Sequence, residues 1–253
     1  ALQHGKLSNN VGRVIMNCAR HVQNFVPENY FDITLNYKLY RDHAELQMEC
    51  GTRLLEGNPD KPQLQEASRH FLLALSYFLH EKCYSLSMEC LKKLSLISLQ
   101  LEISDPPVLH LSKDQAINLM CTKEFPFALT VAVAYDTDTE ENWARAIFEQ
   151  AIKKPGEDFL TPYQYFRPIT AALCDGVVKY FKDEMQKGEN SDAKKKVEMN
   201  GMTERMKQFL YNIPNLVERY RVAKELDFQD QIDTMKEVNP VVCEWCEKVL
   251  LND

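Results

Sequence analysis

The chain has 253 residues, a length that accommodates one large domain or two small ones. Apolar residues make up 45% of it and charged residues 26%, which is ordinary globular usage and excludes an intrinsically disordered chain. Lysine and arginine total 30 against 37 aspartates and glutamates, so the net charge of −7 has the wrong sign for a protein whose main partner is nucleic acid.

The chain contains few residues that break regular structure. Its eight glycines and 11 prolines disfavour β-sandwiches and barrels, which need a turn about every 8–12 residues, and they disfavour glycine-rich phosphate-binding loops. The eight cysteines follow no regular spacing and no signal-peptide pattern is visible, so we expect reduced thiols and a cytoplasmic protein. Because no apolar run approaches the roughly 20 residues of a membrane span, no transmembrane segment is expected.

Helical periodicity dominates the first half of the chain. Apolar residues spaced by three or four predict a helix over residues 11–26 and two helices over residues 30–55, and a loop follows at residues 56–62. Residues 67–79 are apolar over much of a helix circumference, which predicts a central and buried helix. Residues 84–103 end in an alternating pattern, but we interpret them as helix because an isolated strand cannot satisfy its own backbone hydrogen bonds.

The second half carries several signals for helix starts. An N-cap residue followed three positions later by a hydrogen-bonding side chain predicts four starts, and Asn239 before Pro240 predicts a fifth. Residues 188–201 predict a long solvated loop, which short helices near residues 206–210, 216–226 and 241–251 should follow. The four predicted N-cap residues are Ser112, Thr137, Thr161 and Asn215, and the helix after Thr161 should run as far as Phe181.

These segments add up to about ten to twelve helices of modest length with short connections. The predicted fold class is therefore all-α. An irregular α-solenoid of stacked helical hairpins is favoured, and a compact helical bundle is the alternative. We expect a single helical domain over residues 1–253, with residues 188–201 as a loop inside it. The chain begins at Ala1 without a targeting pattern, so we interpret it as a fragment of a larger protein.

No pattern in the sequence predicts catalysis, a cofactor or a metal site. Cys243 and Cys246 form the one Cys-x-x-Cys pair, but no second pair completes a zinc site and no strand leads into it, so we interpret both as packed thiols. The acidic run at residues 136–141 lacks the EF-hand spacing and is typical of a helix start. The six histidines are scattered along the sequence. An all-helical enzyme or ligand-binding domain, with a site assembled from distant residues, stays open as the alternative function.

The basic run Lys194–Lys196 lies in the predicted loop, where solvated side chains are the default interpretation. Direct attraction to an anionic membrane surface is a weaker alternative. About three lysines, at roughly 1 kcal/mol each, bind weakly when they act alone.

Aromatic residues recur near the predicted helix starts and faces. Most should pack between helices, but aromatic side chains also contribute heavily to protein–protein interfaces, so some are expected on a partner surface. We expect Trp143, with Ala132 and Ala134, to fix the turn between two helices. The structural and partner-surface candidates are Trp143, Tyr135, Asp136, Tyr163, Tyr165 and Phe166.

One stretch carries a family resemblance. Residues 119–136 read Leu-Met-Cys-Thr-Lys-Glu-Phe-Pro-Phe-Ala-Leu-Thr-Val-Ala-Val-Ala-Tyr-Asp, an apolar helix ending in Ala-Tyr-Asp, and Trp143-Ala144 opens the next helix after a short turn. Upstream, residues 93–101 form a leucine-rich stretch ending in Leu-Gln-Leu. In the order of these features the chain resembles the C-terminal domain of the spatacsin family, densely over residues 67–181 and more loosely over residues 11–237.

The resemblance implies a role, partners and a location. Spatacsin-like proteins are large and non-enzymatic, so it implies a C-terminal fragment of a scaffold with no catalytic residues and no cofactor. It implies protein partners, namely a spastizin-like protein with a FYVE zinc finger and subunits of the fifth adaptor-protein complex. It also implies recruitment, through those partners, to the cytosolic face of lysosomes and late endosomes, for lysosome reformation and membrane trafficking.

Overall fold

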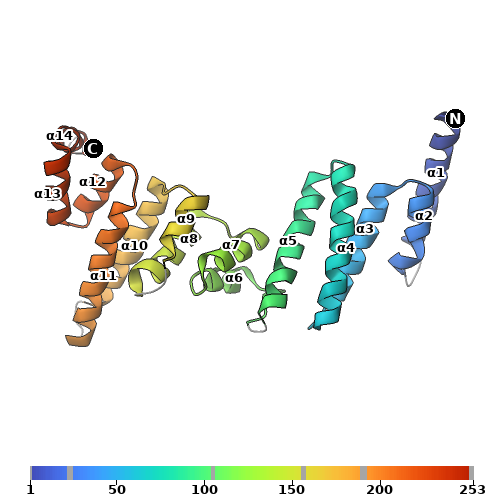
Figure 1. Cartoon of the computed structure of the whole chain (residues 1–253), viewed down its shortest axis with the longest axis horizontal. Helices are drawn as coiled ribbons and strands as arrows, with labels where there is room; N and C mark the ends of the chain where they lie inside the picture. The colour runs from blue at the N-terminus through green and yellow to red at the C-terminus, as the bar shows by residue number, and fades with distance from the viewer. Residues whose placement is uncertain (1, 22–24, 104–105, 155–157, 189–192, 251–253) are drawn as a thin grey trace. The chain divides into compact units, whose positions relative to one another are not determined.

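The computed structural model describes residues 2–21, 25–103, 106–154, 158–188 and 193–250 (Figure 1). Every regular element in these ranges is helical, which confirms the all-α class predicted from the sequence. None of these helices combines the length and the hydropathy that crossing a bilayer requires. The chain divides into two compact units, Ala1–Leu111 and Ser112–Asp253. A single domain over residues 1–253 therefore stays a prediction, as does the preference for a solenoid over a bundle.

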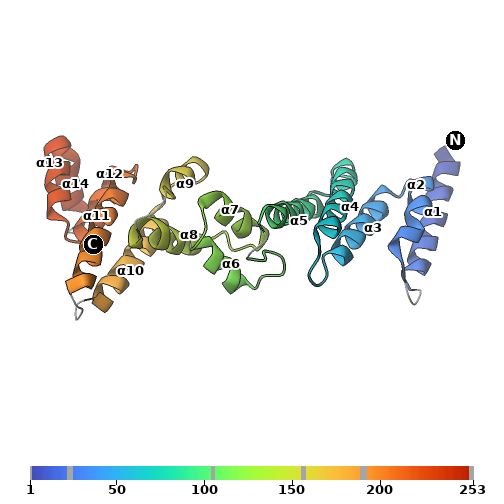
Figure 2. The ribbon, with the colours of Figure 1, turned by 60° about the horizontal axis from the view of Figure 1, so that its bottom comes forward.

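The first unit is built on a layer of three helices. α3 (Tyr40–Leu54), α4 (Lys61–His80) and α5 (Tyr84–Glu102) lie side by side, with α4 between the other two (Figure 2). Phe71 and Phe78 of α4 fill the interior, and Gly51 of α3 packs so closely that a β-carbon there would lie 2.9 Å from the Phe71 ring. The preceding elements are α1 (Leu2–Ala19), a short 3-10 helix (Pro27–Tyr30) and α2 (Phe31–Asn36).

The helix predicted at residues 67–79 is α4, but the expectation that it is buried around its circumference is wrong. Its buried residues, among them Phe71 and Phe78, lie along one stripe, whereas Leu72 and Leu79 are 54% and 50% exposed. Because α3 and α5 cover two sides of α4, a third side of the helix stays open. The hydropathy of a helix alone does not reveal how many neighbours cover it.

A chain of hydrogen-bonded polar side chains crosses the interior of the first unit. The Thr34 hydroxyl donates to the carbonyl oxygen of Phe31 at 2.8 Å, so the His43 ring donates from Nδ1 to Thr34 Oγ1 at 2.9 Å. His43 Nε2 then accepts from the Gln47 amide at 3.2 Å, and Gln47 Oε1 accepts from His70 Nδ1 at 2.6 Å. This arrangement fixes His43 as a neutral tautomer, and burial lowers its pKa.

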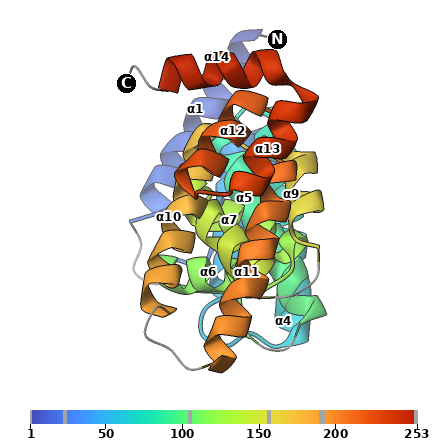
Figure 3. The same ribbon diagram turned by 90° about the vertical axis from the view of Figure 1, so that its left-hand side faces the viewer.

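The second unit is assembled around one apolar core to which helices from α6 to α14 contribute, and Trp143 and Ile147 are among its fully buried side chains. Its elements are α6 (Lys113–Met120), α7 (Phe125–Ala134), α8 (Glu140–Ile147), a π-helix (Phe148–Lys153), α9 (Leu160–Phe166), α10 (Ala171–Gly188), α11 (Ala193–Tyr211), α12 (Leu216–Glu225), α13 (Gln229–Val238) and α14 (Pro240–Leu250). Figure 3 looks onto the end of this unit, where α12, α13 and α14 pack against one another.

The long loop predicted at residues 188–201 is wrong over most of its length. α11 begins at Ala193, so Lys194–Lys196 belong to its first turn, and residues 189–192 lie outside the described residues. Met202 and Met206 of α11 are buried in the core, and their spacing of four residues places one stripe of this polar helix against the rest of the unit. Tertiary packing therefore stabilises a helix in a segment whose composition is typical of a loop.

Two predicted helix starts in the second unit are wrong. Thr161 lies inside α9, whose N-cap residue is Phe159, and the Thr161 N–H donates to the side chain of Asp158 at 3.0 Å. Thr139, and not Thr137, accepts from the backbone in the first turn of α8. The starts at Ser112, Asn215 and Pro240 are confirmed.

Two further differences concern helix number. The single helix expected after Thr161 is two helices, α9 and α10, which Pro168 separates because proline cannot continue the first one and restricts the residue before it. The sequence prediction also lacked α13, a polar helix that buries Ile232 and Met235.

Several helices end on a left-handed residue that is not glycine. After α2, α4, α7 and α12, the residue at this position has a φ of +52° to +58°, and the next N–H donates to the carbonyl five residues back at 2.7–3.0 Å. This Schellman ending prefers glycine, because a β-carbon is strained there. In a chain with only eight glycines, the four positions are occupied by Lys38, Lys82, Asp136 and Asp227.

Candidate interaction site

Trp143, on α8, is the largest fully buried side chain among the described residues. Its ring contacts aromatic rings from α7, from α9 and from the residue that precedes α9. The ring centroid lies 5.6 Å from that of Phe125, 5.5 Å from that of Tyr163 and 6.4 Å from that of Phe159, in the tilted and edge-on arrangements that aromatic pairs favour. Burial raises the pKa of Tyr163 to about 12. This aromatic cluster holds three short helices together.

Asp138 and Arg167 fix the polar edge of the aromatic cluster. The indole N–H of Trp143 donates to Asp138 Oδ1 at 2.7 Å, and the Arg167 guanidinium pairs with the other carboxylate oxygen. The same guanidinium lies over the Trp143 ring, 5.6 Å from its centroid. One carboxylate thus ties the turn before α8 to the segment after α9. The sequence did not predict this pair, because its members lie 29 positions apart.

Tyr135 and Asp136 form part of the turn between α7 and α8. Asp136 occupies the left-handed position of the Schellman ending, which glycine and aspartate adopt more readily than most residues. Thr137 follows with a buried side chain whose hydroxyl contacts the sulfur of Met120 at 3.3 Å. The Ala-Tyr-Asp sequence therefore has a conformational role in this turn. Contact of Tyr135 and Asp136 with a partner stays a prediction.

The aromatic residues of α9 point in two directions. Tyr163 is buried against Trp143, whereas Tyr165 is 86% exposed and Phe166 is 68% exposed. The Phe166 ring is nevertheless anchored, because its centroid lies 5.7 Å from that of the buried Phe125 on α7. The structure thus separates the six predicted candidates into a buried pair, a turn and an exposed aromatic pair. We call Tyr165 and Phe166 the exposed aromatic pair.

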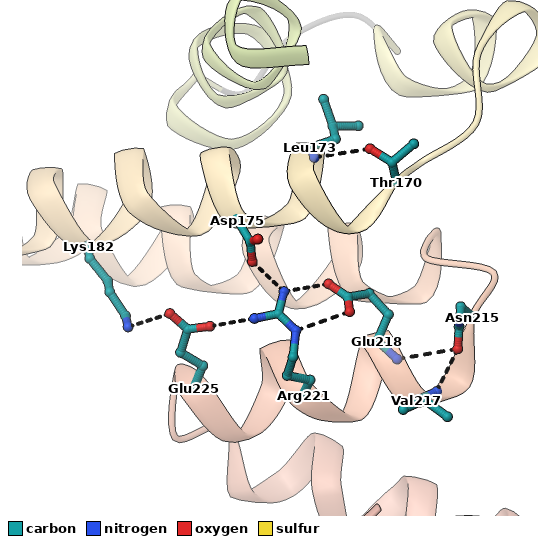
Figure 4. A network of polar contacts seen from close by, with 9 residues as sticks. All are labelled: Thr170, Leu173, Asp175, Lys182, Asn215, Val217, Glu218, Arg221 and Glu225. Atoms are coloured by element: carbon teal, nitrogen blue, oxygen red, sulfur yellow. Dashed lines mark hydrogen bonds and ion pairs between the residues drawn. The ribbon is translucent and has the colours of Figure 1, made fainter. Parts of the chain in front are cut away.

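A second polar network joins α10 to α12 around Arg221 (Figure 4). Its guanidinium pairs with Asp175 of α10 and with Glu218 and Glu225 of its own helix, and Lys182 of α10 pairs with Glu225 at 2.8 Å. The hydrogen-bonded carboxylate of Glu218, followed by that of Asp175, raises the pKa of Arg221. Each charged group of this network is paired within it, which is typical of a structural role.

Two hollows bear on the alternative of an enzyme or ligand-binding domain. One, in the first unit, is lined by residues that include Gln100 and His110, and one in the second unit by residues that include Asp158 and Arg205. His110 Nε2 contacts a backbone carbonyl at 2.7 Å, and Arg205 donates to the last two carbonyl oxygens of the π-helix at 2.6 and 3.0 Å. Backbone groups engage these side chains, so the hollows give the enzyme alternative no support.

Cys243 and Cys246 are buried in the core of the second unit, as their interpretation as packed thiols requires. Burial raises the pKa of both thiols, and a raised pKa lowers the fraction of reactive thiolate. Among the described residues, no three His, Cys, Asp or Glu side chains converge in the way that a metal ion needs. The acidic run at residues 136–141 contributes Glu140 and Glu141 to the first turn of α8.

The structure defines an all-helical protein whose short helices meet at an aromatic core and leave an exposed aromatic pair at the edge of that core. The chain belongs to the family described as the spatacsin C-terminus, which it matches over residues 2–183. This match confirms the family resemblance of the sequence. The last residues of α10 and all of α11, α12, α13 and α14 lie beyond the matched residues.

A relative and the solved structures complete the comparison. A protein of Dictyostelium discoideum is 25% identical over 136 residues, which are 53% of this chain. The chain spans about 4% of the length of that relative. No solved structure matches the chain.

Proposed function

We propose that this chain is a non-enzymatic interaction domain of a spatacsin-like scaffold. In this role it acts with a spastizin-like protein that bears a FYVE zinc finger and with subunits of the fifth adaptor-protein complex. The scaffold is recruited by these partners to the cytosolic face of lysosomes and late endosomes, where it serves lysosome reformation and membrane trafficking. Membership of the spatacsin C-terminus family supports the proposal.

The observation that carries the proposal is the exposed aromatic pair on α9. Solvent-exposed aromatic side chains that are held rigidly are typical of the few residues that dominate the binding energy of an interface. Phe166 is held by its contact with Phe125, and Tyr165 is 86% exposed beside it. The Trp143 cluster and the Asp138–Arg167 pair fix the elements on which this pair is mounted.

The test is a binding assay between this chain and purified partners. The chain is immobilised, and capture of a spastizin-like protein and of adaptor subunits is measured by surface plasmon resonance. Tyr165→Ser should weaken the capture of at least one partner by about tenfold or more, since loss of a central aromatic contact costs more than about 1 kcal/mol. Its melting temperature should not change, because the side chain is exposed.

Tyr211→Ser is the matched control, because Tyr211 is also an exposed tyrosine, on α11. It should leave capture unchanged. Equal capture by the wild type and Tyr165→Ser would remove the exposed aromatic pair from the proposal. Absence of capture by the wild type would contradict the proposed partners themselves.

A further inference from the structure

An exposed apolar surface lies on the first unit, and none of its residues belongs to the elements used in the proposed function. Its five large side chains belong to α4 and α5, and each of them is 47–67% exposed. We call this surface the α4–α5 apolar face and define it as Leu72, Leu79, Tyr84, Met88 and Leu91. Apolar patches of a few hundred Å² are the largest that a typical monomeric protein exposes, and they often have a function.

The five side chains lie on one side of the helical hairpin. Leu72 and Leu79 each follow a buried phenylalanine of α4 by one position, and Met88 and Leu91 each follow a buried residue of α5 by one position. One position turns a helix by about 100°. Because α4 and α5 run antiparallel, a rotation of about 100° from the buried residues points the exposed side chains of both helices to the same side of the hairpin.

The register of the hairpin makes the two rows adjacent along their length. α4 ends at His80 and α5 begins at Tyr84, so the antiparallel arrangement places Leu79 near Tyr84 and Leu72 near Leu91. At 1.5 Å per residue, each row extends for about 10 Å along its helix. The face is therefore a continuous apolar strip that follows the groove between two helices.

The serine hydroxyls along the strip do not need water as a hydrogen-bond partner. The Ser76 hydroxyl donates to the carbonyl oxygen of Leu73 at 2.8 Å, and the Ser95 hydroxyl, which extends the α5 row, donates to the carbonyl of Lys92 at 2.9 Å. Their donors are satisfied inside their own helices, so covering them leaves no unpaired hydroxyl hydrogen. The row Tyr84-Met88-Leu91-Ser95 contains no charged residue.

The area of the face distinguishes between two occupants, a second copy of the chain and a single helix. Five side chains that are each about half exposed amount to on the order of 500 Å² of apolar surface. A stable dimer of globular chains buries roughly 800 Å² on each partner, which is more than this face supplies. A single helix laid along the groove between two antiparallel helices needs only a narrow strip of this length.

We propose that the α4–α5 apolar face binds one amphipathic α-helix of a partner protein. The helix lies along the groove and presents apolar residues at positions i, i+3 or i+4, and i+7 to the two rows. Leu72 and Leu91 contact one end of its apolar stripe, and Leu79 and Tyr84 contact the other. Met88 lies between them, where its flexible side chain adapts to the residue that faces it.

The test uses the whole chain and a defined probe. The probe is a fluorescein-labelled amphipathic helical peptide with leucine at i, i+3, i+4 and i+7 and paired Glu and Lys elsewhere. Binding is measured by fluorescence anisotropy, with a peptide of the same composition and scrambled order as the control ligand. Leu72→Glu and Met88→Glu should each weaken binding by at least about tenfold.

Leu73→Glu is the matched control variant. Leu73 is the next residue of the same helix and is 47% exposed, but it lies about 100° further round, outside the face. It should bind the ordered peptide as tightly as the wild type. Equal binding by Leu72→Glu and Leu73→Glu, equal binding of the scrambled peptide, or no saturable binding would overturn the proposal.

Two further measurements test whether a second copy of the chain or a membrane surface covers the face instead. A concentration-dependent dimer in sedimentation velocity that Leu72→Glu abolishes would show that a second copy covers the face, and it would overturn the helix as occupant. Flotation with neutral phosphatidylcholine vesicles that Leu72→Glu abolishes would do the same in favour of a membrane surface. Either result leaves the capture assay on Tyr165 unaffected.

Discussion

Replacement of Trp143 measures how much the aromatic cluster contributes to the second unit. Trp143→Ala removes a fully buried indole from contact with Phe125, Phe159 and Tyr163 and leaves a cavity. Large-to-small changes of this kind cost about 3–5 kcal/mol of unfolding free energy. Because native domains are stable by only about 5–15 kcal/mol, this one change removes a large part of the stability.

Trp143→Phe separates the ring from its hydrogen bond. The variant keeps most of the apolar contact but loses the bond from the indole N–H to Asp138 at 2.7 Å. A hydrogen bond to a charged group contributes about 1.5–3 kcal/mol, and the lower end applies because Asp138 is partly exposed and keeps Arg167 as a partner. We therefore expect a loss of about 2 kcal/mol, including the smaller ring.

The assay is urea unfolding followed by far-ultraviolet circular dichroism. The free energy should fall in the order wild type, Trp143→Phe, Trp143→Ala. Trp245→Ala is the control, because this second tryptophan is 53% exposed on α14 and its loss should cost less than about 1 kcal/mol. If Trp143→Ala costs no more than Trp245→Ala, the central position of Trp143 is refuted.

Three other predictions test single features. Asp227→Gly should melt at or above the wild-type temperature, whereas Asp227→Val should lose about 1–2 kcal/mol, because a β-branched residue is strained at positive φ. Equal melting of the two variants would contradict the left-handed turn after α12. Burial lowers the pKa of His43, so its contribution to stability is fully present above about pH 6.5 and is lost as the pH falls below that value. His43→Gln should reduce this acid-induced drop in melting temperature, and an unchanged drop would contradict the assignment. Ellman's reagent should modify the exposed Cys18 in the native protein and should reach the buried thiols only after denaturation. Burial raises the thiol pKa to about 12 at Cys50 and Cys174 and to about 11 at Cys90 and Cys121. Fast reaction of these four thiols in the native protein would contradict their burial.

Features of the fold that depend on neighbouring residues were predictable. The caps at Ser112 and Asn215 use a side chain and backbone groups within three positions, so the sequence contains the whole interaction. The same reasoning failed at Thr137, because Thr139 offers an equivalent cap two residues later. Packing against Met120 draws Thr137 into the core, and that contact is invisible in the sequence.

The features that the sequence prediction missed depend on distant contacts. α11 is polar for most of its first half, and its helical state follows from the burial of Met202 and Met206. Of the candidate site, the sequence indicated the central Trp143 and the exposed aromatic pair as members of one group without separating them. Their division into buried and exposed residues follows from how α9 packs on α7, and the Asp138–Arg167 pair joins residues on either side of α8 and α9.

The turns that end on Lys38, Lys82, Asp136 and Asp227 have a consequence for the mutational history of the chain. Glycine at such a position relieves backbone strain, so a substitution by glycine there can increase the free energy of unfolding. A single base change converts an aspartate codon to a glycine codon, whereas a lysine codon needs two. Selection for suppressors of a destabilised variant should therefore recover glycine at Asp227 more often than at Lys38 or Lys82.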